Sequence, residues 1–122
     1  VVFKSCDFTT VNFAMTDQVI FDFQFDDCTL DYAQFYKLKL RKMMFSKCSM
    51  VAVDFMEADL SLATFDHCDL RLAVFMRTNL SQTDFLTSFN YIIDPEKNKV
   101  KKAIFSLEGV KGLLAKYDLR IK

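Results

Sequence analysis

The stretch from Val53 to Leu70 reads Val-Asp-Phe-Met-Glu-Ala-Asp-Leu-Ser-Leu-Ala-Thr-Phe-Asp-His-Cys-Asp-Leu, with a large apolar residue at every fifth position. The same spacing runs from Phe25 to Phe85, and all thirteen such positions are apolar. The residue two places before each of them is uncharged in every case. A period of five fits neither an α-helix, which repeats about every 3.6 residues, nor an ordinary strand, which repeats every two. It indicates a solenoid built from short sides.

The number of sides follows from two longer periods in the same segment. Phe alternates with Leu or Met, which requires an even number of sides per coil, and three cysteines recur at intervals of 20 residues. Four five-residue sides therefore make one coil of an all-β, quadrilateral parallel β-helix, with successive coils about 4.8 Å apart. The predicted core columns are Phe25, Phe45, Phe65 and Phe85, with Cys28, Cys48 and Cys68.

The first coil follows the rule with a slip. Phe3, Phe8 and Phe13 are five residues apart, but the offset from Phe3 to Phe25 is 22 rather than 20. We expect a small bulge at a corner near Met15 to Ile20, and slightly more than four coils in total. Because the chain has only two glycines, the composition also argues against a fold with many tight turns that demand glycine.

The repeat stops at Phe89, and a loop with a turn at Asp94-Pro95 follows. After one further unit that ends at Phe105, Ser106 can cap an amphipathic α-helix of about three turns. Its apolar positions are Val110, Leu113, Leu114 and Tyr117, and Leu119 and Ile121 alternate like a brief strand. We therefore divide the chain into residues 1–93, a β-helix, and residues 94–122, a segment that covers its exposed end.

Four triplets carry a resemblance to a known family: Ala58-Asp59-Leu60, Cys68-Asp69-Leu70, Thr78-Asn79-Leu80 and Thr83-Asp84-Phe85. They resemble the unit of pentapeptide-repeat proteins, which is a small residue, Asp or Asn, Leu or Phe, and two variable positions. The resemblance covers residues 3 to 89 and implies a right-handed, four-sided β-helix.

The tail narrows the resemblance. Lys101-Lys102-Ala103-Ile104-Phe105-Ser106-Leu107 and Gly112-Leu113-Leu114-Ala115-Lys116-Tyr117 are similar to the quinolone-resistance (Qnr-type) branch. That similarity implies a rod-shaped homodimer joined through the C-terminal segment, and a DNA mimic that binds DNA gyrase and topoisomerase IV and protects them from quinolones. The residues it implies for the cap or dimer contact are Phe105, Val110, Leu113, Leu114, Tyr117, Leu119 and Ile121.

The cysteines and the single histidine offer little chemistry. The cysteines could form disulfides, bind a metal or simply pack. Buried free thiols fit best, because parallel inward side chains lack the crossed geometry of a disulfide. His67 and Cys68 should point apart and cannot share a tetrahedral metal. One histidine leaves no convincing pair of nucleophile and base. We expect no enzyme activity, cofactor, metal or small-molecule substrate.

Charge is balanced in total but arranged in blocks. The chain has 16 basic and 16 acidic residues, which argues against a protein that coats nucleic acid. Residues 5–36 carry six Asp and no Lys or Arg, residues 37–53 carry five basic residues and no acid, and residues 54–69 are acidic again. The candidate acidic contact patch for a partner comprises Asp22, Asp26, Asp27 and Asp31. A solubilising face is the alternative reading, as a generic protein-interaction scaffold is for the function.

The sequence shows neither a membrane span nor a targeting segment. No stretch approaches the roughly 18 apolar residues that would span a bilayer, and no signal peptide is visible. We expect a cytoplasmic protein that does not enter membranes.

Overall fold

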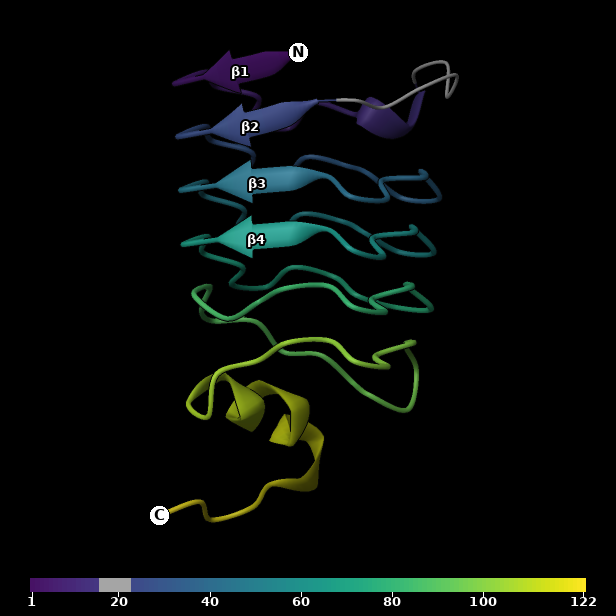
Figure 1. The fold of residues 1–122 in the computed structure, drawn as a ribbon, viewed down its shortest axis with the longest axis vertical. Helices are drawn as coiled ribbons and strands as arrows, with labels where there is room; N and C mark the ends of the chain where they lie inside the picture. The colour runs from purple at the N-terminus through teal and green to yellow at the C-terminus, as the bar shows by residue number, and fades with distance from the viewer. Residues whose placement is uncertain (16–22) are drawn as a thin grey trace.

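The computed structural model describes residues 1–15 and 23–122 as a stack of coils (Figure 1). Its named strands are β1 (Val2–Lys4), β2 (Gln24–Asp26), β3 (Met44–Ser46) and β4 (Thr64–Asp66), which form one parallel sheet in chain order. Phe25 pairs with Phe45, and Phe45 pairs with Phe65. Like residues therefore stand above like at intervals of 20, as predicted.

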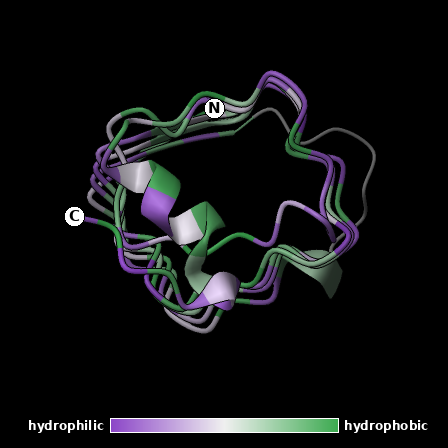
Figure 2. Cartoon of the chain, turned by 90° about the horizontal axis from the view of Figure 1, so that it is seen from below, coloured by the Kyte–Doolittle hydropathy of each residue, from purple (hydrophilic) through white to green (hydrophobic). Residues whose placement is uncertain are grey.

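The other three sides of each coil are joined by isolated parallel bridges. Thr29 pairs with Ser49, Gln34 with Asp54, and Lys39 with Asp59, so a bridge recurs every five residues. Viewed along the rod, the coils superimpose as one closed outline (Figure 2). The prediction of an all-β, parallel β-helix with four sides per coil is confirmed.

The slip in the first coil is confirmed. Phe3 pairs with Phe25 and Asn12 with Gln34, each across 22 residues, whereas Gln24 pairs with Met44 across 20. The two extra residues therefore fall between Asn12 and Gln24. A 3₁₀ helix, η1 (Phe13–Met15), occupies the start of this segment. The rest of the predicted bulge, residues 16–20, lies outside the described residues.

Stacked phenylalanines fill the core. The rings of Phe45 and Phe65 have centroids 5.0 Å apart and planes 5° apart, and Phe65 and Phe85 repeat this arrangement at 5.1 Å and 6°. A second column crosses the first edge to face, as in the 74° angle between Phe45 and Phe55. Each fully buried ring stabilises the fold by about 1.5 to 3 kcal/mol.

Hydroxyl and thiol groups that point inward donate hydrogen bonds to backbone carbonyl oxygens of the coil before them. Thr78 and Thr83 donate from their hydroxyls to the carbonyl oxygens of Phe55 and Leu60, each 23 residues earlier, at 2.9 and 2.8 Å. The Cys68 thiol donates to the Phe45 carbonyl oxygen at 3.4 Å in the same way. The four cysteines are free, and all but Cys6 are buried. The inward thiols therefore pack and donate hydrogen bonds, as small residues of the core.

The corners depart from the expectation drawn from glycine content. Twelve residues at five-residue intervals from Asp27 to Gln82 have φ between 51° and 65°, and none is glycine. This left-handed conformation costs a non-glycine residue roughly 1 to 2 kcal/mol. The ladder offsets the cost, because most of these corner N–H groups donate to a backbone carbonyl of the next coil, as Ala52 does to Arg71 O at 2.9 Å. The scarcity of glycine therefore did not exclude turns with positive φ.

The C-terminal segment corrects two expectations. In place of one α-helix it contains two short 3₁₀ helices, η2 (Gly109–Leu113) and η3 (Ala115–Tyr117). Residues 118–122, predicted as a brief strand, form no strand. Tyr91 is buried at the end of the core, and the backbone of Gly112 approaches it so closely that a Cβ atom would clash with the Tyr91 carbonyl. Close packing on Tyr91 thus uses glycines, which disfavour a long α-helix. The predicted cap is confirmed, because Ser106 Oγ accepts the Gly109 N–H at 2.9 Å.

The division at residue 93 stays a prediction. The bridges Asn79–Lys99 and Asp84–Ile104 continue the ladder across it, and Phe105 stacks on Phe85 at 5.2 Å. Among the described residues, no helix has the length and apolar character to cross a membrane.

Candidate functional site

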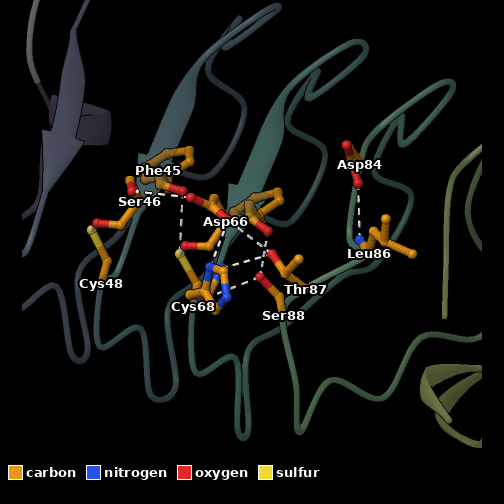
Figure 3. A network of polar contacts seen from close by, with 11 residues as sticks. Phe45, Ser46, Cys48, Asp66, Cys68, Asp84, Leu86, Thr87 and Ser88 are labelled. Atoms are coloured by element: carbon orange, nitrogen blue, oxygen red, sulfur yellow. Dashed lines mark hydrogen bonds and ion pairs between the residues drawn. The ribbon is translucent and has the colours of Figure 1, made fainter.

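Outward-facing Asp and Asn residues hold the corners in shape. Asp84 accepts a hydrogen bond from the Leu86 N–H, two residues later, at 2.9 Å (Figure 3), and Asp54, Asp59 and Asn79 act in the same way at their own corners. This is an Asx turn, in which a short side chain replaces a backbone acceptor. The acidic residues at these positions therefore have a structural role besides their charge.

The predicted acidic patch is only partly brought together. Asp26 and Asp27 are adjacent at one corner, and Asp31 lies at the next corner, one five-residue side away. Asp31 accepts hydrogen bonds from the Ser49 hydroxyl at 2.7 Å and the Val51 N–H at 2.9 Å, so it also ties two coils together. Asp22 lies outside the described residues.

The bridge register shows a charge pattern that the linear sequence conceals. One side of the rod, with the bridge residues Asp7, Thr29, Ser49, Asp69 and Phe89, follows the side of the β-strands. This side and its two flanking corners carry six acidic and three basic residues. We call it the acidic side: Asp7, Asp26, Asp27, Asp31, Asp66 and Asp69, interrupted by Lys4, Lys47 and Arg71.

The opposite side carries the opposite charge. Its bridge residues are Lys39, Asp59, Asn79 and Lys99. With its flanking corners it holds, among residues 1–15 and 23–122, nine basic residues against three acidic ones. We call it the basic side: Lys37, Lys39, Arg41, Lys42, Arg77, Lys97, Lys99, Lys101 and Lys102, against Glu57, Asp59 and Glu96. Counting charges in consecutive blocks of the sequence does not reveal this division. Sorting the charged residues by their position within the 20-residue coil would have revealed it.

A hydrogen-bonded network fixes one corner of the acidic side (Figure 3). The Thr87 hydroxyl donates to Asp66 Oδ1 at 3.0 Å and accepts the His67 N–H at 2.9 Å, while His67 Nδ1 lies 2.7 Å from Asp66 Oδ1. The Thr87 hydroxyl and the His67 ring hold the pKa of Asp66 below its ordinary value. The Thr87 hydroxyl bonds to the Asp66 carboxylate and to a backbone N–H rather than to the His67 imidazole. The network therefore favours the ionised form of Asp66, and the imidazole is not placed to activate the hydroxyl as a nucleophile.

His67 and Cys68 diverge as expected. His67 is exposed at a left-handed corner, whereas Cys68 is fully buried. The hydrogen bond with Cys48 and burial raise the pKa of the Cys68 thiol, which keeps it in the unreactive neutral form. In residues 1–15 and 23–122, no group of three or more potential ligand side chains could hold a metal ion.

A groove opens on the basic side near the C-terminal end. It has a volume of about 730 Å³, and its walls include Glu57, Arg77, Lys97 and Lys99. Arg77 is fixed there by Glu57, with Nη2 3.0 Å from Oε1. The chain turns at residues 94–97, where the Lys97 N–H donates back to Asp94 O at 3.2 Å.

The residues implied for the cap or dimer contact fall into two groups. Phe105 and Leu113 are partly buried and pack against the core, and Val110 and Leu114 are also half-buried. Tyr117, Leu119 and Ile121 are exposed. The first group lies at or beside the end of the core, the second group is exposed, and the role of both in a cap or dimer contact stays a prediction.

The chain combines a five-residue period, four sides per coil, small inward residues and Asx turns at the corners. A family model described as "Pentapeptide repeat region" matches residues 18–89. The chain belongs to the pentapeptide-repeat family. The small residue of the family's unit is the inward position, its Asp or Asn is the corner acceptor, and its Leu or Phe forms the core column.

Solved pentapeptide-repeat proteins share this fold. HetL from the cyanobacterium Nostoc sp. strain PCC 7120, involved in the regulation of heterocyst differentiation, matches 84% of this chain with 17% identity and a TM-score of 0.55. This chain spans only 38% of HetL. The match shows the fold alone.

Two further structures are more distant in shape. QnrB1, a plasmid-mediated fluoroquinolone resistance protein, has 16% identity over 99% of this chain and 80% of its own, with a TM-score of 0.37. Rfr23 from the cyanobacterium Cyanothece 51142 has 15% identity over 87% of this chain and 88% of its own, also at 0.37. No curated protein sequence matches this pentapeptide-repeat chain.

Proposed function

We propose that this chain is a non-catalytic binding rod whose acidic side occupies a positively charged, DNA-binding surface of a protein partner. The separation of charge onto opposite sides of the rod supports this role. DNA gyrase and topoisomerase IV are the proposed partners, because the tail of the chain resembles the quinolone-resistance branch. The coarser role, a repeat scaffold, is what the fold supports directly.

The acidic side has the geometry that such a contact needs. Its carboxylates project from a backbone held by ladder hydrogen bonds, so little backbone freedom is lost on binding. Asp26 and Asp66 occupy the same column two coils apart, with the uncharged Ser46 between them, so the register fixes their carboxylates roughly 9.6 Å apart along the rod. Negative charges held at fixed positions are complementary to a groove that binds phosphates.

A scaffold for a different partner is the second candidate. Lys4, Lys47 and Arg71 interrupt the acidic side and leave a net charge of −3 from six acidic and three basic residues. B-DNA carries one charge per roughly 1.7 Å. The charge density of the acidic side is therefore lower than that of DNA. A partner that binds a less charged surface would suit it better than gyrase.

Supercoiling by DNA gyrase, measured with increasing amounts of the protein and with or without a fluoroquinolone, separates the two candidates. Inhibition by the protein alone, or rescue from the drug, supports the gyrase proposal. The double variant Asp26→Asn, Asp27→Asn should then lose the effect. The control Asp54→Asn, Asp84→Asn removes the same charge elsewhere and keeps an acceptor for each Asx turn. Loss in both variants, or no effect of the native protein in large excess, would favour the scaffold.

We also propose that the rod is a homodimer through the exposed apolar residues of its C-terminal segment. Leu119 and Ile121 are 56% and 47% exposed, which leaves apolar surface at this end of the rod for a second copy to cover. Leu119→Lys with Ile121→Lys should halve the mass measured by light scattering. Leu86→Lys, at an equally exposed position on the strand side, is the control. A native mass equal to that of one chain would refute the dimer without bearing on gyrase.

A further inference from the structure

Each coil of the rod is hydrogen-bonded to the next by a fixed set of backbone groups. On the basic side, Leu80 and Gln82 donate their N–H groups to Lys99 O and Lys101 O at 2.7 and 2.9 Å. In return, the Thr78 carbonyl accepts the Lys99 N–H at 3.1 Å. The same pattern joins Leu60, Leu62 and Ala58 to the coil after them.

The last coil has the same groups without the next coil. The positions equivalent to Leu80, Gln82 and Thr78 are Val100, Lys102 and Asn98. Within residues 1–15 and 23–122, the N–H groups of Val100 and Lys102 and the carbonyl of Asn98 have no hydrogen-bond partner. We call residues 98–102 the terminal edge.

The C-terminal segment leaves this edge open. In the views from the side and along the rod, η2 and η3 lie under one part of the last coil rather than across its whole outline (Figures 1 and 2). Leu40, Leu60 and Leu80 in the column above are 0% exposed, whereas Val100 in the same column is only partly buried. The ladder and the core are therefore both incomplete at this point.

Positive charge surrounds the terminal edge. Lys97, Lys99, Lys101 and Lys102 are all exposed. The neighbouring Glu96 is already engaged by Lys116 Nζ at 2.9 Å and by the Tyr117 hydroxyl at 2.8 Å. Lysines on an edge strand discourage other strands from pairing with it, and they select against any segment that is not itself acidic.

From the unpaired groups and this charge, we propose that the terminal edge binds an extended acidic segment of a partner protein as an added β-strand. Main-chain hydrogen bonds to residues 98–102 supply the pairing, and the lysines supply the selectivity. The tail of a second copy does not fit, because it carries Arg120 and Lys122 and would bring like charges together. This inference is independent of the gyrase proposal, which concerns the opposite side of the rod.

The test uses the full chain and short fluorescent peptides, with binding measured by anisotropy. The first peptide alternates Val and Glu, the second alternates Val and Lys, and the third is the Val and Glu peptide with N-methyl groups on alternate residues. We expect the first peptide to bind and the second not to bind. The third keeps the charge but loses donors, and should bind at least about tenfold more weakly.

Variants locate the contact. Lys99→Glu with Lys102→Glu should weaken the Val and Glu peptide at least about tenfold. Lys39→Glu with Lys42→Glu is a matched control, since these residues occupy the same columns on a coil whose backbone is already paired. Hydrogen exchange should show the Val100 and Lys102 amides protected only when the peptide is bound.

Three outcomes would overturn the inference. The Val and Glu peptide could fail to bind, which would leave the lysines as protection against aggregation only. The N-methylated peptide could bind as tightly as its parent, which would indicate charge attraction without strand pairing. The control variant could lose as much affinity as the edge variant, which would place the contact elsewhere on the basic side.

Discussion

Gly112 lies against the backbone of Tyr91, with no space for a Cβ atom between them, and its carbonyl oxygen accepts the Ile93 N–H at 3.0 Å. Through this contact the C-terminal segment is held to the end of the core. Gly109 lies against the Tyr91 hydroxyl in a similar way, although there the neighbour is the tip of a side chain. The only two glycines of the chain thus serve one contact.

Gly112→Ala should therefore destabilise the protein by about 1 to 3 kcal/mol, because backbone must move to admit the methyl group. Gly109→Ala is the matched control and should have a smaller effect, since a side chain gives way more easily than a carbonyl. Thermal unfolding of both variants measures the difference. Equal midpoints for Gly112→Ala and the native protein would contradict the packing described for Tyr91.

Ala52→Gly should stabilise the rod, by about 0.5 to 1 kcal/mol after the greater freedom of glycine in the unfolded chain is subtracted. Ala52 has φ 58°, so the substitution relieves a left-handed corner. Ala115→Gly is the opposite case, because Ala115 lies in η3, and it should lower stability by a similar amount. Urea unfolding of the two variants should give shifts of opposite sign, and a loss of stability in both would argue against strain at the corners.

Thr83→Val should cost about 1 to 3 kcal/mol, because it keeps the shape of the side chain but leaves the Leu60 carbonyl without its donor in the core. Thr83 is 0% exposed, so water cannot replace the hydroxyl. Thr83→Ser retains the donor and tests the lost methyl group alone. Should Val prove the milder substitution in denaturant unfolding, packing rather than hydrogen bonding would govern the inward positions.

The ion pairs of Lys116 should make the attachment of the C-terminal segment weaker at acidic pH. Its Nζ lies 3.0 Å from Asp94 Oδ1 and 2.9 Å from Glu96 Oε2, and these contacts lower the pKa of both carboxyls from ordinary values of 3.8 and 4.5. A lowered pKa stabilises the fold above the unfolded-state value and ceases to do so as the pH falls through the folded-state value.

The melting temperature of Lys116→Gln, measured from neutral pH downwards, tests this directly. The native protein should be the more stable near neutrality, and the gap should close as the pH falls below about 4.5. Lys101→Gln, at an exposed lysine of the last coil, is the control. A gap that stays constant over the whole range would exclude the two carboxylates as its source.

The repeat could be predicted because each inward residue lies between the equivalent residues of the coils before and after it, so the same kind of residue recurs at a fixed spacing. The spacing of Phe25, Phe45 and Phe65 alone determines the register, and the offset of Phe3 locates the slip. Positive φ at the corners could not be predicted, since the ladder bonds that offset it come from residues 19 positions later, as Ala52 N–H to Arg71 O illustrates.

The C-terminal segment was the least predictable part. Val110, Leu113, Leu114 and Tyr117 have helical spacing, but the close approach of Gly112 to Tyr91 favoured short 3₁₀ turns over a continuous α-helix. The acidic patch was inferred from neighbours in sequence, whereas neighbours in space are 20 residues apart. Asp66 and Asp69 therefore belong with Asp26 and Asp27, which consecutive reading did not reveal.

The twenty-residue register also constrains how such a chain can change its length. An insertion of five residues would turn everything after it through one quarter of the outline and carry acidic residues onto a different side. A duplication of one whole coil, sixty nucleotides of coding sequence, would add about 4.8 Å of rod and leave every later charge facing as before. The 22-residue offset between Phe3 and Phe25 departs from this register by two residues. Lineages of this rod should therefore differ by complete coils or by small expansions at corners.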